Sequence, residues 1–114
     1  MVEFNKKEPP REFRVGRRGV ISMSDCGTLV LEDDEQVTFV SSSGAEYDVA
    51  SKSWGYYATP SVNGRLKAFG YKTAFVKNAK GALYVMIVEQ AKMKEFLSYC
   101  EQESQTVVEW LSDR

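Results

Sequence analysis

The hydrophobic pattern of this chain changes its period near Gln90. Before that position, residues 45–49 and 65–77 alternate apolar and polar side chains, which is typical of half-buried β-strands. After it, apolar side chains recur at helical spacing, at Met93, Phe96, Leu97 and Cys100. The pattern therefore predicts a β-rich chain followed by one amphipathic helix.

Two turn signals divide the β-rich part into hairpins. Four consecutive acidic residues, 32–35, have a β-prone run on either side, which predicts a hairpin loop. Residues 78–81 separate the alternating run at 65–77 from an apolar run at 82–88, and this predicts a second hairpin. Because residues 82–88 carry no charged side chain, they are typical of a central strand that is buried on both faces.

The end of the chain fits two structures. Helical spacing continues beyond residue 104, at Val107, Val108 and Leu111. However, residues 106–108 are β-prone and follow a polar break, so we favour a helix, a break and a short final strand within 105–111. The predicted fold class is α+β, a mostly antiparallel β meander or small barrel of roughly six to seven strands with one C-terminal helical element.

The length of 114 residues fits one domain of ordinary size. Residues 1–11 are polar and end with two prolines and an arginine, so the sequence predicts a flexible N-terminal arm there and a single compact domain over 12–114. Within that domain we expect Trp54, Phe69 and Phe75 to fill the core, because a small barrel needs large side chains inside it.

The N-terminal residues lack the apolar stretch of a secretory signal, and no run approaches the roughly 18 apolar residues of a membrane-spanning helix. We therefore expect a cytoplasmic protein that has no contact with a membrane. Cys26 and Cys100 are predicted to be free, buried thiols, since nothing in their spacing indicates a disulfide.

The chain contains no histidine. This excludes Ser-His-Asp and Cys-His catalysis and histidine-ligated metal sites within a single chain. The dinucleotide fingerprint and the P-loop are missing as well. We predict a non-enzymatic protein with no catalytic residue, no metal site and no cofactor. An enzyme that uses tyrosine, lysine or a carboxylate such as Asp48 is the least favoured alternative.

The net charge of −1 hides opposing blocks along the chain. Residues 21–50 carry seven acidic residues and no basic one, whereas residues 51–80 carry six basic residues and no acidic one. The basic block also holds six of the fourteen aromatic residues. Aromatic faces stack on sugars and bases, and lysine and arginine bind phosphate or carboxylate, so this block is the candidate binding surface.

Within the basic block, we predict that the loop at 51–67 binds a small anionic or polar ligand, such as a sugar phosphate, a nucleotide or a glycan. The candidate binding residues combine cations, an amide and two aromatic rings: Lys52, Tyr56, Tyr57, Asn63, Arg65 and Lys67. Nucleic acid is disfavoured as a partner, because the acidic blocks would repel a long polyanion.

Two other interpretations of the charge blocks stay open. The basic block can be a structural complement of the acidic block at 21–50, which would stabilise strand pairing or a homodimer. Segregated charge together with aromatic residues also suits a protein-interaction or assembly subunit. A protein partner is therefore the alternative to a small ligand.

Overall fold

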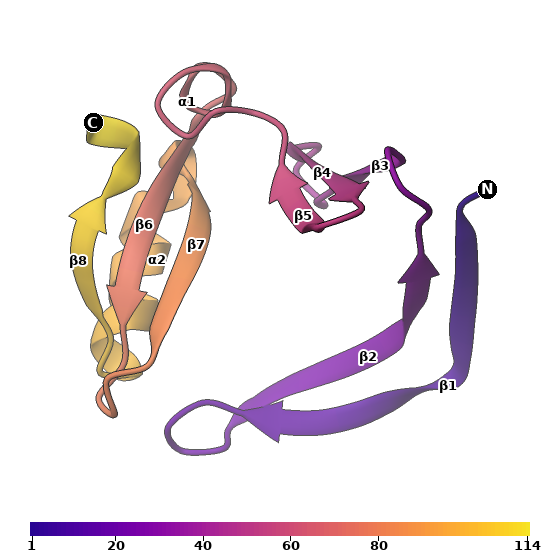
Figure 1. The fold of residues 1–114 in the computed structure, drawn as a ribbon. Helices are drawn as coiled ribbons and strands as arrows, with labels where there is room; N and C mark the ends of the chain where they lie inside the picture. Colours follow the sequence, from indigo (N-terminus) through magenta and orange to yellow (C-terminus); the bar gives the residue numbers. More distant parts are fainter. The chain divides into compact units, whose positions relative to one another are not determined.

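The computed structural model describes residues 1–114, which divide into two compact units, Met1–Thr59 and Pro60–Arg114. The N-terminal unit holds five strands, and the C-terminal unit holds three strands and the helices (Figure 1). The boundary lies within the stretch 12–114 that the sequence predicts as one domain. The predicted α+β class is confirmed, with eight antiparallel strands in three separate sheets rather than six to seven in one meander or barrel. No helix has both the length and the hydropathy needed to cross a membrane.

The first sheet of the N-terminal unit is a two-stranded ribbon of β1 (Glu3–Val15) and β2 (Ile21–Val30). Its register shifts between Lys6 and Arg11, on either side of two consecutive prolines, because proline has no N–H to donate to the ladder. Pairing resumes beyond this break. The strand thus begins at Glu3, inside the segment 1–11 that the sequence predicts as an arm.

The second sheet of this unit has three strands in chain order, β3 (Gln36–Val40), β4 (Glu46–Lys52) and β5 (Gly55–Ala58). The hairpin predicted around residues 32–35 is wrong, because β2 pairs with β1 and β3 pairs with β4. The acidic loop instead connects the two sheets. It is bonded to β4, since the Asp34 N–H donates to the Ser51 carbonyl and the Ser51 N–H donates to the Glu35 carbonyl, each at 2.8 Å.

The C-terminal unit is a three-stranded sheet with a helix packed against it (Figure 1). Its strand order is β7–β6–β8, with β6 (Tyr71–Lys77), β7 (Leu83–Glu89) and β8 (Thr106–Trp110). The helical elements are α1 (Arg65–Ala68), η1 (Gln90–Lys92), α2 (Met93–Gln102) and η2 (Leu111–Asp113). The predicted hairpin is confirmed in β6 and β7, and the predicted helix, break and final strand are confirmed in α2 and β8.

Two predictions for this unit are wrong. Residues 65–68 form α1 rather than the start of a strand, and this short helix buries Leu66 completely. The central strand is β6, so the apolar run at 82–88 lies at a sheet edge, where the side chains of Leu83 and Val85 are 56% and 61% exposed. An apolar run shows what a strand is able to bury, but it does not show on how many sides the strand is paired.

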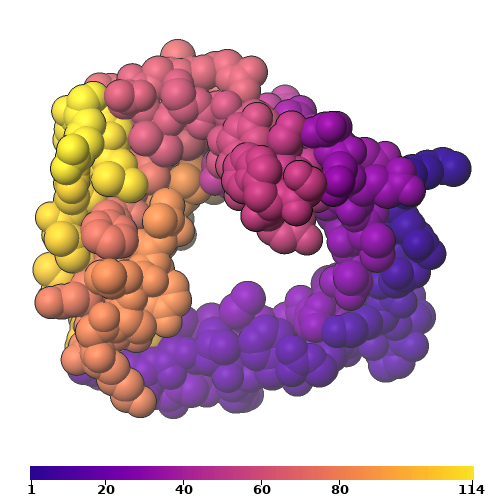
Figure 2. Space-filling model, viewed as in Figure 1, coloured from indigo at the N-terminus to yellow at the C-terminus, as the bar shows by residue number.

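Buried side chains are concentrated in the C-terminal unit, at Pro60, Leu66, Tyr71, Thr73, Ala74, Val76, Val88, Cys100 and Ser112. The N-terminal unit, coloured from indigo to magenta in Figure 2, buries only Ala50 and Ser51. The predicted aromatic core is wrong, because Trp54 and Phe69 are 70% and 56% exposed and Phe75 is only half-buried. The core is built from smaller side chains instead.

Candidate functional site

The six residues predicted to bind a ligand fall in both units. Lys52, Tyr56 and Tyr57 lie on the β4–β5 hairpin of the N-terminal unit. Asn63, Arg65 and Lys67 lie in and just before α1 of the C-terminal unit. The two sets are therefore described separately. That all six residues bind one ligand stays a prediction.

The acidic loop holds the ammonium group of Lys52. This group donates a hydrogen bond to a carboxylate oxygen of Asp34, and the bond and the charge of Asp34 raise the pKa of Lys52. Asp34 reaches this position because its backbone is bonded to Ser51 and adopts a left-handed φ of 67°. The contact joins the basic block to the acidic block, which favours the structural-complement interpretation for Lys52.

Three aromatic rings of the same hairpin are exposed, those of Trp54, Tyr56 and Tyr57. Trp54 stacks on Tyr57, with ring centroids 5.9 Å apart and ring planes 24° apart. Tyr56 is 71% exposed. Trp54 is a candidate binding residue that the sequence prediction placed in the core. The glycine after it, which has a φ of 143°, is the signal that could have placed Trp54 at a hairpin turn.

A tight turn at 61–64 positions the residues around α1. Gly64 leaves room for Ser61 in this turn, because a Cβ at position 64 would lie 2.5 Å from the hydroxyl oxygen of Ser61 and would force that side chain to move. The same hydroxyl accepts a hydrogen bond from the backbone N–H of Arg65 at 3.1 Å, which fixes the start of the helix.

The predicted site residues of this set have different surroundings. The side-chain amide of Asn63 donates to the backbone carbonyl of Arg114 at 3.3 Å, so it is engaged in an internal contact. The guanidinium of Arg65 lies 5.8 Å from the centre of the Phe69 ring, within the range of a cation–π interaction. Lys67 is exposed on α1. Of the three, Arg65 and Lys67 present positive charge.

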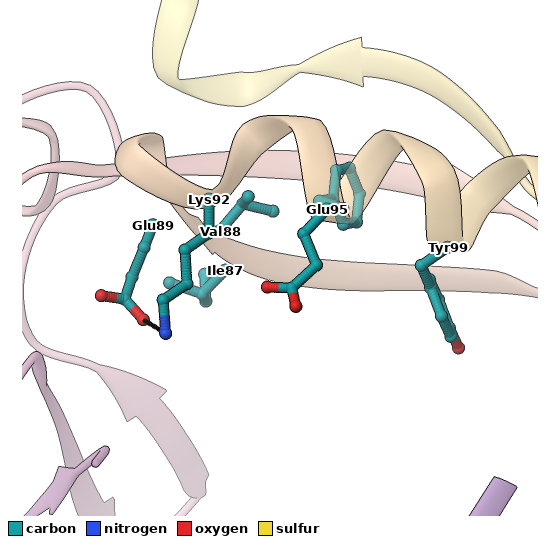
Figure 3. Close-up of a pocket in the computed structure, with 7 residues that line it drawn as sticks. Ile87, Val88, Glu89, Lys92, Glu95 and Tyr99 are labelled. Carbon is teal, nitrogen blue, oxygen red and sulfur yellow. Dashed lines mark ion pairs between the residues drawn. The ribbon is translucent and has the colours of Figure 1, made fainter. Parts of the chain in front are cut away.

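The C-terminal unit also contains an open groove that sequence reasoning missed. It has a volume of about 230 Å³ and lies between the edge strand β7 and α2 (Figure 3). The lining residues are Ile87, Val88 and Glu89 of β7, Lys92 of η1, and Glu95, Phe96 and Tyr99 of α2. One signal in the sequence was available, because Glu95 and Tyr99 are four residues apart and share a helix face beside the predicted apolar stripe.

Two of the three charged side chains in the groove form an ion pair with each other, and the third has no such partner. The ammonium of Lys92 lies 3.8 Å from a carboxylate oxygen of Glu89. The carboxylate of Glu95 points out of the helix on the same side as this pair, and it has no ion-pair partner (Figure 3). The groove therefore combines apolar walls with one available negative charge.

No three cysteine, aspartate or glutamate side chains are close enough together to hold a metal ion. In the acidic loop, one carboxylate oxygen of Glu35 accepts a hydrogen bond from the Glu32 N–H at 2.8 Å. Both cysteines are free, as predicted, but only Cys100 is buried, so the predicted burial of Cys26 is wrong. Burial raises the pKa of the Cys100 thiol, which disfavours the reactive thiolate.

The surfaces described above contain a stacked ring pair and ion pairs. No family model, no curated protein and no solved structure matches the chain.

Proposed function

We propose that this protein is an assembly subunit, a protein-interaction module that binds a second copy of itself through the N-terminal unit. The observation that carries the proposal is the distribution of burial in that unit. Only Ala50 and Ser51 are buried there. Large apolar side chains are exposed along both of its sheets, among them Phe4, Met23, Leu29, Val30, Phe39 and Val40.

Such a unit gains little stability from its own contacts. A two-stranded ribbon is marginal in water, and small units need a core or another source of stability. Full burial of one Val, Leu or Phe side chain contributes about 1.5–3 kcal/mol. Burial of several such side chains by association therefore offsets much of the entropy cost of binding. A second copy is the simplest partner, because most soluble oligomers are built from identical chains.

In this proposal the protein acts in the cytoplasm, without catalysis, metal or cofactor, and nucleic acid is not its partner. The acidic block at 21–50 and the basic block at 51–80 then steer the approach of two copies.

The test is the mass of the full-length chain in solution, measured by sedimentation velocity over a range of concentrations. We expect a dimer or larger assembly. The substitution Phe39→Asp should shift it toward the monomer, because Phe39 is half exposed on the edge strand β3. Gln36→Asp is the matched control, since it adds the same charge at an exposed polar position of β3. A wild-type chain that stays monomeric at every concentration contradicts the proposal.

A small anionic or polar ligand remains the second candidate, and the exposed stack of Trp54 on Tyr57 favours it. The test is a thermal-shift screen of sugar phosphates, nucleotides and glycans. It compares the wild type with Trp54→Ala and with the double variant Arg65→Glu/Lys67→Glu. A compound that stabilises the wild type but not one of the variants supports a site at the residues that this variant changes. A screen in which no compound stabilises the wild type counts against this candidate.

A further inference from the structure

The register of the β6–β7 hairpin determines which backbone groups of β7 face away from the sheet. The pairing is antiparallel, and hydrogen bonds at its two ends join Asn78 N–H to the Ala82 carbonyl and Gln90 N–H to the Gly70 carbonyl. In such a ladder, hydrogen-bonded pairs alternate with non-bonded ones. The backbone N–H and C=O groups of Tyr84, Met86 and Val88 therefore point inward and bond to β6. The backbone groups of Leu83, Val85 and Ile87 point outward, away from the sheet.

This outward edge lacks the usual features that prevent strand addition. Natural edge strands carry a charged side chain, a proline or a bulge. The only charged residue of β7 is Glu89 at its end, so residues 83–88 contain no charge and no proline, and their register with β6 is unbroken. The side chains of Leu83 and Val85 are exposed as well. The edge of the sheet thus presents both hydrogen-bonding groups and apolar surface to another extended chain.

Contacts with α2 identify the two faces of the sheet. Trp110 lies opposite Ala74 and packs edge-to-face on Phe96 of α2, with ring centroids 5.9 Å apart. Ala74 also lies opposite Met86, so Met86 and Val88 belong to the face that α2 covers. Side chains of an added strand that lie opposite Met86 and Val88 would enter the groove beside Glu95. Their neighbours would lie on the other face, beside Val85.

We propose that the groove between β7 and α2 binds an extended segment of a partner protein as a fourth strand of the sheet. In that segment, a lysine or arginine faces Glu95 and apolar residues alternate with it on the opposite face. The charge of the groove selects this partner over a second copy of β7. Residues 83–88 hold no basic side chain that could face Glu95, and the next residue is another acid, Glu89. This site lies in the C-terminal unit and does not depend on the assembly proposed for the N-terminal unit.

The probe is a fluorescein-labelled peptide that alternates valine and lysine, and binding is followed by fluorescence anisotropy with the full-length protein. Two matched peptides serve as controls. One replaces the lysines with glutamate, and the other carries N-methyl groups on alternate backbone nitrogens, which removes the donors that an added strand needs. We expect the lysine peptide to bind, the glutamate peptide to bind about tenfold more weakly or worse, and the methylated peptide not to bind.

Two charge reversals on α2 test the position of the peptide. Glu95→Lys should weaken binding of the lysine peptide by about tenfold or more and strengthen binding of the glutamate peptide. Glu101→Lys makes the same change of charge on the same helix, outside the groove, and should leave both affinities unchanged. If Glu95→Lys binds the lysine peptide as tightly as the wild type does, the proposal is overturned.

Hydrogen exchange gives a readout at the strand itself and does not depend on a variant. In the free protein, the amides of Leu83, Val85 and Ile87 should exchange faster than those of Tyr84, Met86 and Val88. The lysine peptide should slow the exchange of the outward amides. The proposal is overturned if no peptide binds, or if the outward amides are already protected in the dilute free protein. It is also overturned if their protection rises with protein concentration alone, which identifies a second copy as the occupant.

Discussion

Thr73 is fully buried in β6, and its hydroxyl group has no hydrogen-bond partner. Its backbone is better satisfied, because the N–H donates to the hydroxyl of Ser112 in η2 at 3.4 Å. A buried polar atom without a partner loses its bond to water on folding and gains nothing in return. The hydroxyl group of Thr73 therefore opposes stability at the centre of the core.

Replacement of Thr73 by valine should raise the free energy of unfolding by about 1 kcal/mol, because it removes the unpaired hydroxyl and keeps the branched shape. Urea denaturation measures the change. Thr106→Val is the control, since Thr106 is exposed on β8, and it should change stability by less than about 0.5 kcal/mol. A loss of stability in Thr73→Val would show that the hydroxyl does have a partner in solution.

Asp25 gives the ribbon a dependence on pH. Its carboxylate accepts a hydrogen bond from the ammonium of Lys7 at 2.5 Å, and this bond lowers the pKa of Asp25 below its ordinary value of 3.8. The carboxylate thus contributes stability that is fully present above about pH 3.8 and is lost as the pH falls through the folded-state pKa. Thermal unfolding of the wild type and Asp25→Asn at a series of pH values should show a stability difference near neutral pH that disappears in acid. A difference that is constant with pH contradicts this assignment.

At the scale of elements, the local patterns in the sequence were sufficient to predict the β6–β7 hairpin, α2 and the final strand β8. They were not sufficient to predict strand neighbours. The alternation of β6 resembles a half-exposed strand, but β6 is paired on both sides, whereas the more apolar β7 is paired on one. Pairing partners depend on contacts between distant residues, which a local pattern does not contain.

The candidate site shows the same limit. Lys52 and Tyr57 lie on the predicted loop and are accessible in part. Nothing local to Lys52 indicates that Asp34, eighteen residues earlier, binds its ammonium group. The groove beside Glu95 was missed for a similar reason, because it exists only where α2 packs on the edge of β7.

Two proline substitutions test the register of the edge strand. Tyr84→Pro should destabilise the protein by about 3 kcal/mol, because it removes an N–H that bonds to β6. Val85→Pro removes an outward N–H, so it should cost about 1 kcal/mol or less. Chemical denaturation measures both values. If Val85→Pro is the more damaging of the two, the register derived for β7 is wrong by one residue.

At the scale of the whole molecule, the two units differ in how they are stabilised. The C-terminal unit contains nearly all buried side chains, whereas the N-terminal unit exposes most of its apolar ones. The composition does not indicate this difference in burial between the two units. The 43% of hydrophobic residues is ordinary for one well-packed domain.

We therefore expect thermal unfolding of the full-length chain to show two transitions. The first should report the N-terminal unit and move to higher temperature as protein concentration rises, since association stabilises only the bound form. The second should report the C-terminal unit and stay fixed. Circular dichroism melts over a range of concentrations measure both. A single transition that does not depend on concentration would contradict this expectation.

The exposed edge of β7 also has a consequence for the aggregation of the newly made chain. Residues 83–88 are a six-residue apolar stretch of the kind that stacks into cross-β fibrils when many copies meet before folding or binding. If the proposed partner binds this edge, its binding would compete with aggregation of the newly made protein. A physiological partner made at the same time would act as a chaperone, and the yield of soluble chain would follow the supply of that partner.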